Sequence, residues 1–332
     1  MFIKALNASA SEISLHPIPI GKIINPCSRY SLINSVDFHP QRNLFCITLT
    51  HANCVILYQI DKGESHIFQT LSNPASCLSL PQHAAFSPDG TKIVVANWEN
   101  QTLALYKCEE SGLFQEKPAA LISSPRCLVH CKPHGIAFSP SGHFLAIAYG
   151  AANDHGRAIA LFRVRENNLE LASVIESIWG IPKGIAFSPD GACLLVSFAD
   201  TSSLAIFNLE GPEIFPIPRQ ILHGSETKIS RPEDVKISPD GKYCAVSNSD
   251  QDTVTFYPFD PTSNQITQPF PCYVHQNPEA EHSFPHGMAF SPDGFYFLVT
   301  EFGPIRATPD GNLFWKKETR PQLAKVNLYA RF

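Results

Sequence analysis

Six polar side chains stand at the same position of a recurring segment, and together they offer the groups that acid–base chemistry uses. Each lies four residues before the phenylalanine or isoleucine that closes a short apolar stretch. The six are Asn34, Gln82, His134, Lys183, Glu233 and His286. Imidazole, ammonium and carboxylate groups in one place bind polar small molecules or move protons, provided that the fold brings them together.

A seventh candidate is Glu301, which ends the apolar stretch that follows His286. Two consecutive antiparallel strands return the chain to the face from which it started. We therefore expect Glu301 to lie beside His286 and to complete a set of seven ligand-binding residues. The alternative interpretation is a wet, polar channel mouth with no ligand.

The positions of these residues follow an internal repeat. The segment 36–40, VDFHP, recurs as AAFSPDG, GIAFSPSG, GIAFSPDG, VKISPDG and MAFSPDG. Its proline stands at positions 40, 88, 140, 189, 239 and 292, so the spacing is 48 to 53 residues. A period near 50 residues is typical of the four-stranded blades of a β-propeller.

Each unit predicts the same local structure. A short strand ends at Ser-Pro-Asp-Gly, where proline fixes φ and glycine permits a left-handed turn. An apolar second strand follows, for example KIVVAN or CLLVSF. The polar residues then lie where each innermost strand enters the central channel, and the Ser-Pro-Asp-Gly turns lie on the opposite face.

We predict an all-β chain that forms a single β-propeller over residues 1–332, with blades that start near residues 34, 82, 134, 183, 233 and 286. Six blades are expected, and seven are the alternative. Residues 1–33 are expected to close the last blade, with FIKALNA and EISLHPIPI as its third and fourth strands. Residues 302–332 are only partly assigned, because NLFWKK and KVNLYARF both have the character of a strand.

The repeat resembles a known type. SPDGTKIVVANWENQTLALY and SPDGKYCAVSNSDQDTVTFY resemble the YVTN-type β-propeller repeat, in which SPDG precedes an apolar strand that ends in asparagine. The resemblance covers residues from about 34 to 301. The wider group includes the lactonase-type propellers, similar to bacterial 6-phosphogluconolactonase. The WD40 class is less similar, since no unit has a Trp-Asp dipeptide.

The lactonase resemblance also implies catalytic residues. In that group one strand begins Pro-Arg-His and the next ends Asn-Glu. The nearest equivalents here are Phe284-Pro285-His286 and Thr300-Glu301, without the arginine. The resemblance therefore implies His286 and Glu301 as the catalytic pair if the chain is a lactone hydrolase.

Two functions follow from these observations, one without catalysis and one with it. The first is a binding module that presents the polar ring to a protein or a polar small molecule. Trp98, Phe198 and Phe302, which follow second strands, would suit a protein partner. The alternative is a lactonase-type hydrolase with its site at the channel mouth. The net charge of −5, without blocks of like charge, disfavours nucleic acid and anionic membranes as partners.

No cofactor and no metal is expected. The segment CLVHCKPH holds Cys127, His130, Cys131 and His134. A structural zinc site, however, generally draws ligand pairs from two separated segments. The chain also lacks a phosphate-binding glycine loop and a dinucleotide fingerprint.

The cysteines indicate a reducing compartment. Of the ten cysteines, Cys46, Cys193 and Cys244 fall inside apolar strands, where a thiol packs as a small hydrophobe. No apolar run approaches the length of a membrane span, and the first residues contain no apolar stretch of signal-peptide length. We expect a cytoplasmic protein with free thiols.

Overall fold

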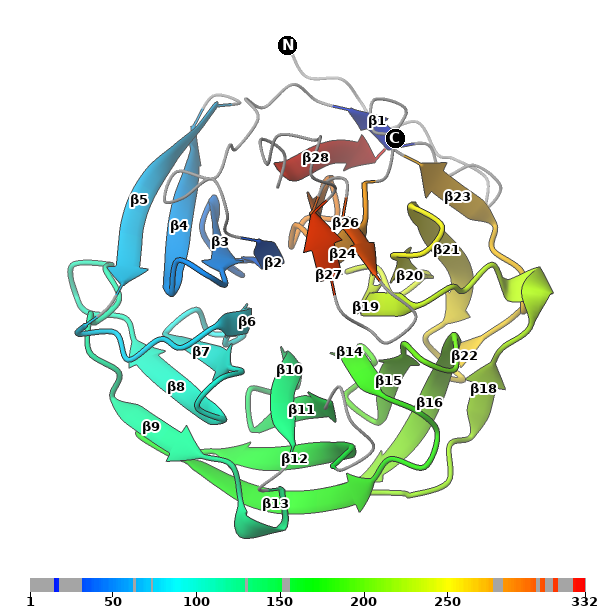
Figure 1. Ribbon diagram of the computed structural model, residues 1–332, viewed down its shortest axis with the longest axis horizontal. Coiled ribbons are helices and arrows are strands. Elements are labelled where there is room, and N and C mark those ends of the chain that lie inside the picture. Colours follow the sequence, from blue (N-terminus) through cyan, green and yellow to red (C-terminus); the bar gives the residue numbers. More distant parts are fainter. Residues whose placement is uncertain are drawn as a thin grey trace.

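A ring of β-sheets surrounds a central axis in the computed structural model (Figure 1). The structure describes residues 15–17, 32–61, 64–72, 74–128, 131–150, 156–276, 283–302, 305–307, 313–315 and 325–331. These residues form strands and two short 3-10 helices, Arg126–Leu128 and Ser225–Thr227. The predicted all-β propeller is confirmed. Within the described part of the chain, no helix has the length and apolar character needed to cross a membrane.

The first three blades are antiparallel sheets of four consecutive strands, with the first strand of each nearest the axis (Figure 1). Blade one contains β2 (Ile33–Phe38), β3 (Leu44–Leu49), β4 (Cys54–Asp61) and β5 (Glu64–Ser72). Blade two contains β6 (Pro81–Phe86), β7 (Lys92–Asn97), β8 (Thr102–Lys107) and β9 (Ala120–Ser123). Blade three contains β10 (Lys132–Phe138), β11 (Phe144–Gly150), β12 (Ala158–Val164) and β13 (Leu169–Glu176).

Blades four and five differ at the rim, where two short strands share the outermost position. Blade four contains β14 (Pro182–Phe187), β15 (Cys193–Phe198) and β16 (Ser203–Glu210), and β16 pairs with both β17 (Glu213–Ile214) and β18 (Gln220–Leu222). Blade five contains β19 (Pro232–Ile237), β20 (Tyr243–Asn248) and β21 (Thr253–Asp260), and β21 pairs with both β22 (Gln265–Ile266) and β23 (Tyr273–Gln276).

The last blade joins the two ends of the chain. Its inner strands are β24 (Pro285–Phe290) and β25 (Tyr296–Glu301), its third strand is β28 (Lys325–Arg331), and its outermost strand is β1 (Leu15–Pro17). The prediction that the N-terminal segment closes this blade is confirmed for β1. The predicted third strand, FIKALNA, is wrong, because β28 pairs with β25 over six consecutive positions. Residues 1–14 lie outside the described residues.

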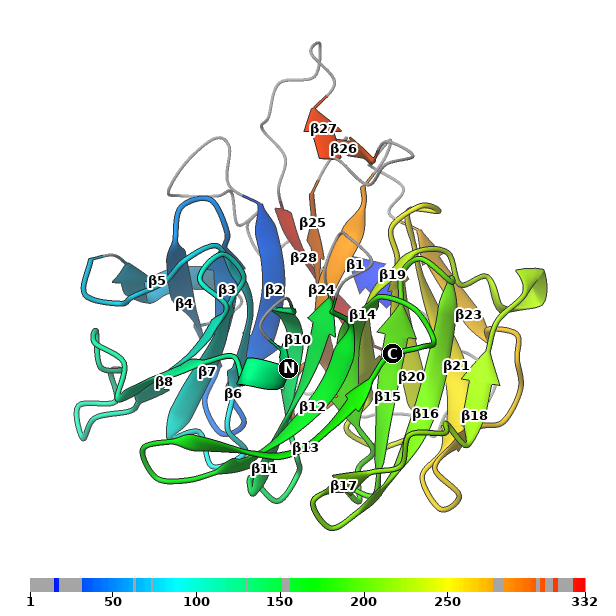
Figure 2. The ribbon, with the colours of Figure 1, turned by 60° about the horizontal axis from the view of Figure 1, so that its bottom comes forward.

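The chain between β25 and β28 makes a hairpin instead of a tight turn. NLFWKK contributes β27 (Leu313–Trp315), which pairs with β26 (Ile305–Ala307) and with no strand of the blade. Figure 2 shows this pair standing above the inner strands of the last blade. Of the two candidate strands in residues 302–332, only KVNLYARF therefore belongs to the propeller sheet.

The described residues close the ring with six blades, as predicted. β24 of the last blade lies against β2 of the first, and His286 Nδ1 is 2.7 Å from the carbonyl oxygen of Asn34. A Cβ on Gly287 would lie 2.6 Å from that same oxygen. Between blades four and five the approach is equally close, since a Cβ on Gly184 would lie 2.5 Å from Cα of Asp234. The first and last blades are therefore direct neighbours.

The blades bury their apolar faces against each other. Between blades one and two, for example, Cys46, Val55 and Tyr106 are completely buried. Cys193 and Cys244 are buried in the same manner, as their apolar surroundings in the sequence predicted. None of the nine cysteines in the described residues forms a disulfide. The core is thus a set of interblade layers, and the central channel is left to the innermost strands.

The Ser-Pro-Asp-Gly turns are held by their own side chains. In blade two, Ser87 Oγ accepts the N–H of Lys92 at 3.0 Å and donates to Asp89 Oδ1 at 2.5 Å. Gly90 adopts a φ of +71°, which favours glycine. The turn aspartate of blade two therefore stabilises a turn rather than forming a ligand site.

The channel has two mouths with different linings. One cavity, of about 390 Å³, is lined by the turn prolines Pro88, Pro140, Pro189 and Pro239. A second cavity, of about 250 Å³, is lined by the six polar residues of the predicted ring. We call these ends the turn mouth and the ring mouth. The prediction that turns and polar ring lie on opposite faces is consistent with this separation.

Candidate functional site

The six predicted ring residues line one cavity, and each comes from the innermost strand of a different blade. They are Asn34 of β2, Gln82 of β6, His134 of β10, Lys183 of β14, Glu233 of β19 and His286 of β24. Equivalent positions of successive blades therefore form a ring at the ring mouth, as the repeat predicts.

The local sequence explains why these side chains converge. In blades three, four and six the ring residue is followed by glycine, where the backbone of the next blade approaches closely. A Cβ on Gly135, for example, would lie 2.1 Å from the carbonyl oxygen of Lys183. Glycine thus allows neighbouring innermost strands to touch, and the adjacent ring residues are brought within reach of each other.

Glu233 lies at the centre of the charges in the cavity. Its side chain is buried, with Lys183 Nζ and His286 Nε2 at 3.5 and 3.4 Å from its Oε2. Arg231 Nε is 3.9 Å from Oε1. Burial by itself would raise the pKa of Glu233, but Lys183 and then His286 lower it well below its ordinary value. The carboxylate is therefore ionised at neutral pH.

His134 is held in its neutral form. Its Nε2 lies 3.3 Å from Lys183 Nζ, and its ring is buried. Burial, together with the charge of Lys183 and the proximity of His286, lowers the pKa of His134 well below 6.5. A neutral imidazole whose Nε2 faces a cation carries a lone pair at that atom, and this lone pair is directed into the cavity.

His286 is oriented by the first blade and by an aromatic wall. Its Nδ1 lies 2.7 Å from the carbonyl oxygen of Asn34, so Nδ1 carries a hydrogen and donates it. Its ring stacks on Phe302 with 4.5 Å between centroids, and Phe302 stacks on Phe284 at 5.3 Å. These contacts fix the plane of the imidazole.

The amides on the far side of the ring pair with each other. Asn34 Nδ2 donates to Gln82 Oε1 at 2.5 Å. Asn34 Oδ1 is buried, and no described residue donates a hydrogen bond to it. A buried carbonyl oxygen without a donor is unusual, and here it offers an acceptor to a molecule bound in the cavity.

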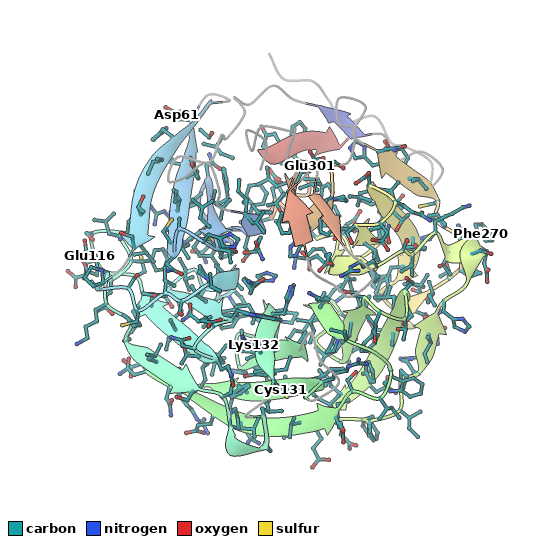
Figure 3. The ribbon with its side chains drawn as sticks, viewed as in Figure 1. Asp61, Glu116, Cys131, Lys132, Phe270 and Glu301 are labelled. Atoms are coloured by element: carbon teal, nitrogen blue, oxygen red, sulfur yellow. The ribbon has the colours of Figure 1, made fainter. Side chains whose placement is uncertain are left out.

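Glu301 does not join the ring, in contrast to our prediction. It lies opposite Pro285 in the register and is buried, but it does not line the ring-mouth cavity. Figure 3 places it within the last blade rather than at the central axis. At the equivalent register position of blade two, Asn97 accepts the N–H of Ser79, which lies in the loop before the innermost strand.

The three aromatic residues that follow second strands lie in different environments. Trp98 lines the cavity, and Lys183 Nζ lies 5.9 Å from its ring centroid. Phe302 also lines it but is 2% exposed, while Phe198 is buried in the interblade core. The expectation that all three present an exposed surface to a protein partner is therefore wrong for Phe198 and Phe302.

Sequence reasoning missed a further set of lining residues just before the strand prolines. Leu80, Arg231 and Phe284 each precede a proline, line the cavity and have φ values of 46°, 46° and 47°. The shared left-handed conformation turns the chain into the channel at this point. The only signal in the sequence was the recurring position directly before the strand proline. The types of these residues do not indicate a left-handed backbone conformation.

The chain resembles known lactonase propellers. A family model described as "Lactonase, 7-bladed beta-propeller" matches residues 33–213, which contain blades one to three and the inner strands of blade four. The description gives seven blades, one more than the described residues of this chain form. A search of curated proteins finds no match.

Several solved structures share the fold. The periplasmic gluconolactonase PpgL of Pseudomonas aeruginosa aligns with a TM-score of 0.62 and 17% identity, over 90% of this chain and 88% of that one. Putative 6-phosphogluconolactonases of Bacteroides uniformis and Bacteroides fragilis align with TM-scores of 0.60 and 0.57. Their identities are 16% and 17%, over 84% and 83% of this chain and 82% and 80% of theirs. At such identities these likenesses establish the fold only.

Proposed function

Because this chain belongs to the Lactonase family of β-propellers, we propose that it hydrolyses a lactone at the ring mouth. One observation carries the proposal. The neutral imidazole of His134 contacts the ammonium of Lys183 inside a buried polar cavity that also holds an ionised carboxylate. A base and a cation side by side are the two groups that ester hydrolysis needs.

In the proposed reaction a water oxygen attacks the carbonyl carbon of the lactone. His134 Nε2 takes a proton from that water and returns it to the ring oxygen when the ring C–O bond breaks, which leaves a hydroxy acid. Lys183 and Arg231 stabilise the negative charge that develops on the carbonyl oxygen. Glu233 stays ionised and balances the positive charges before and after the reaction.

The walls of the cavity suit a ring-shaped, hydroxylated substrate. Trp98 supplies apolar surface, against which the C–H face of such a ring packs. Asn34 Oδ1 is the unsatisfied acceptor on the opposite side and would accept a substrate hydroxyl.

Hydrolysis of glucono-δ-lactone and of 6-phosphogluconolactone by the purified chain, followed in a pH-stat above the spontaneous rate, tests the proposal. We expect His134→Gln to lower kcat/KM about 10²- to 10⁴-fold, because a positioned general base is lost. Lys183→Met is expected to lower it about 10²- to 10³-fold.

His223→Gln is the matched control, since His223 is exposed and does not stand at a ring position of the repeat. It should hydrolyse lactones at the wild-type rate. No hydrolysis above background, or an unchanged rate in His134→Gln, would contradict the proposal. Binding of a lactone without turnover would instead support the non-catalytic binding module.

A further inference from the structure

Three side chains with metal-binding groups meet at the ring mouth. His134, Glu233 and His286 each offer one ligand atom, and the three atoms lie within 4.8 Å of one another. Each residue is at most 6% exposed. They come from blades three, five and six, so no local motif reveals them in the sequence.

Both imidazoles are oriented as metal ligands are. His286 donates its Nδ1–H to the Asn34 carbonyl, and its Nε2 faces Glu233. His134 has its own hydrogen bond to the backbone of Lys183, while its Nε2 faces the cavity. A ring N–H donated to a backbone carbonyl is the usual support of a histidine that binds a metal through its other nitrogen.

Two of the three ligand atoms lie especially close to each other. His286 Nε2 and Glu233 Oε2 are 3.4 Å apart, and Lys183 Nζ lies 3.5 Å from the same oxygen. A carboxylate oxygen and an imidazole nitrogen at that distance can both bind one cation that lies between them. The pair therefore offers one defined point for a positive charge.

We propose that His134, Glu233 and His286 form a binding site for a divalent transition metal, with zinc as the best match. Imidazole and carboxylate ligands suit zinc, and three protein ligands leave one position open. Zinc bonds of about 2.0–2.1 Å in a tetrahedron place ligand atoms about 3.3 Å apart. The edge between His286 and Glu233, 3.4 Å, already has that length.

Lys183 competes with the metal for this point. Its Nζ lies 3.3 Å from His134 Nε2 and 3.5 Å from Glu233 Oε2, so the ammonium satisfies two of the three ligands. The Lys183 side chain is 21% exposed, and its flexible stem allows the ammonium to move toward solvent when a metal binds. A bound metal would then supply the activated water in place of His134.

The site differs from the zinc motif weighed in the sequence. CLVHCKPH supplies ligands that are adjacent in the chain, and its Cys127 is exposed. The ring-mouth site shares only His134 with that segment and draws its other ligands from strands about 100 and 150 residues further on. The expectation of no metal rested on adjacent residues alone.

A zinc titration of the full-length chain tests the proposal. The protein is stripped with EDTA, exchanged into metal-free buffer and titrated with zinc in a calorimeter, without substrate. We expect about one zinc ion per chain in the wild type. His134→Gln should weaken binding at least about tenfold, and Lys183→Met should strengthen it at least about tenfold, because the competing cation is removed.

Cys127→Ser is the control for thiol binding and should leave the affinity unchanged. Circular dichroism confirms that each variant is folded, and His286→Gln replaces His134→Gln if the latter is not. Substoichiometric zinc, loss of binding in Cys127→Ser, or no gain in Lys183→Met would overturn the proposal. Because no substrate is present, the result is independent of lactone hydrolysis, and either proposal can fail alone.

Discussion

The two mouths of the channel are built by the same six strands, yet their chemistry differs. At the ring mouth every strand contributes a polar residue. Three residues further along the same strands, four of the six positions are alanine. The exceptions, Asp37 and Lys236, line the cavity of the turn mouth. The repeat therefore places mostly small side chains three residues further along each strand and a polar side chain from every strand at the ring mouth.

Two carboxyl groups, one near each mouth, show what the difference depends on. Glu233 at the ring mouth is held ionised by Lys183 and His286, against the effect of burial. At the turn mouth burial prevails and raises the pKa of Asp37 from 3.8 to about 6, although Asp37 accepts the N–H of Phe86. The pKa values of the two carboxyl groups are thus shifted in opposite directions.

The direction of each pKa shift depends on whether a lysine contacts the carboxylate directly. At the ring mouth, Lys183 contacts Glu233 directly. At the turn mouth, Lys236 Nζ lies 3.0 Å from Asp234 Oδ1 and so serves a different carboxylate. Asp37 is left with a weaker, more distant interaction with Lys236. A buried carboxylate is stabilised by a cation in contact with it and destabilised by desolvation without one.

The largest expected effect is at the ring mouth. Glu233→Gln removes the buried negative charge and leaves Lys183 and Arg231 facing each other across a neutral amide. We expect the free energy of unfolding at pH 7 to fall by about 3–5 kcal/mol, measured by urea denaturation. Because the pKa of Glu233 is lowered from 4.5 in the folded state, this contribution is present above pH 4.5 and is lost as pH falls further.

Glu170→Gln is the matched control for that measurement. Glu170 Oε2 lies 2.8 Å from Arg165 Nε, but both side chains are about half exposed. The expected change is below about 1 kcal/mol, because solvent screens an exposed pair. Equal losses in the two variants would remove the distinction between buried and exposed charge on which the comparison rests.

An effect of opposite sign is expected at the turn mouth. Asp37→Asn keeps the acceptor for the Phe86 N–H but removes a carboxyl whose pKa is raised in the folded state. Such a group contributes stability below pH 3.8 that is lost as pH rises through about 6. The variant should therefore be more stable than the wild type at pH 7, by about 1–3 kcal/mol, and equal to it near the acid end.

Urea denaturation at several pH values measures that difference, with the exposed Asp250→Asn as a control that should show none. A loss of stability in Asp37→Asn at pH 7 would mean that the carboxylate is stabilised where it lies. The contrast between the two mouths would then not depend on the partner of the carboxylate.

The smallest effect is expected from His83, which lines the turn-mouth cavity. Burial and the charge of Lys236 lower the pKa of His83 well below 6.5, so the folded protein keeps it neutral. As pH falls below 6.5 the unfolded chain takes up a proton that the folded chain does not, and stability falls. His83→Ala should reduce that slope by up to about 1.4 kcal/mol per pH unit and leave stability above pH 8 nearly unchanged.

The slope is read from unfolding midpoints between pH 7 and pH 5, and the exposed His223→Ala should keep the wild-type slope. Three other blades have glycine at the position of His83, so the fold tolerates a small residue there. An unchanged slope in His83→Ala would show that His83 gains a proton in the folded protein.

The sequence alone was sufficient for the architecture and for six of the seven predicted site residues as a spatial group. The 48- to 53-residue period sets the order of strands and turns within each blade, because these elements pair with neighbours in the chain. The same period places Asn34, Gln82, His134, Lys183, Glu233 and His286 at equivalent points of successive innermost strands. Both features depend on the order and spacing of residues within each repeat, which can be read directly from the sequence.

Only the tertiary structure decided which of these groups interact. The pairing of Lys183 with Glu233, and of Lys236 with Asp234, depends on side-chain directions across the channel that residue spacing does not contain. The third strand of the last blade is β28 and not the N-terminal segment. Its pairing with β25 joins residues about 30 positions apart, and the sequence contains several segments that could have taken this place. Glu301 was misplaced because its cross-strand partner is Pro285 and not the ring residue His286.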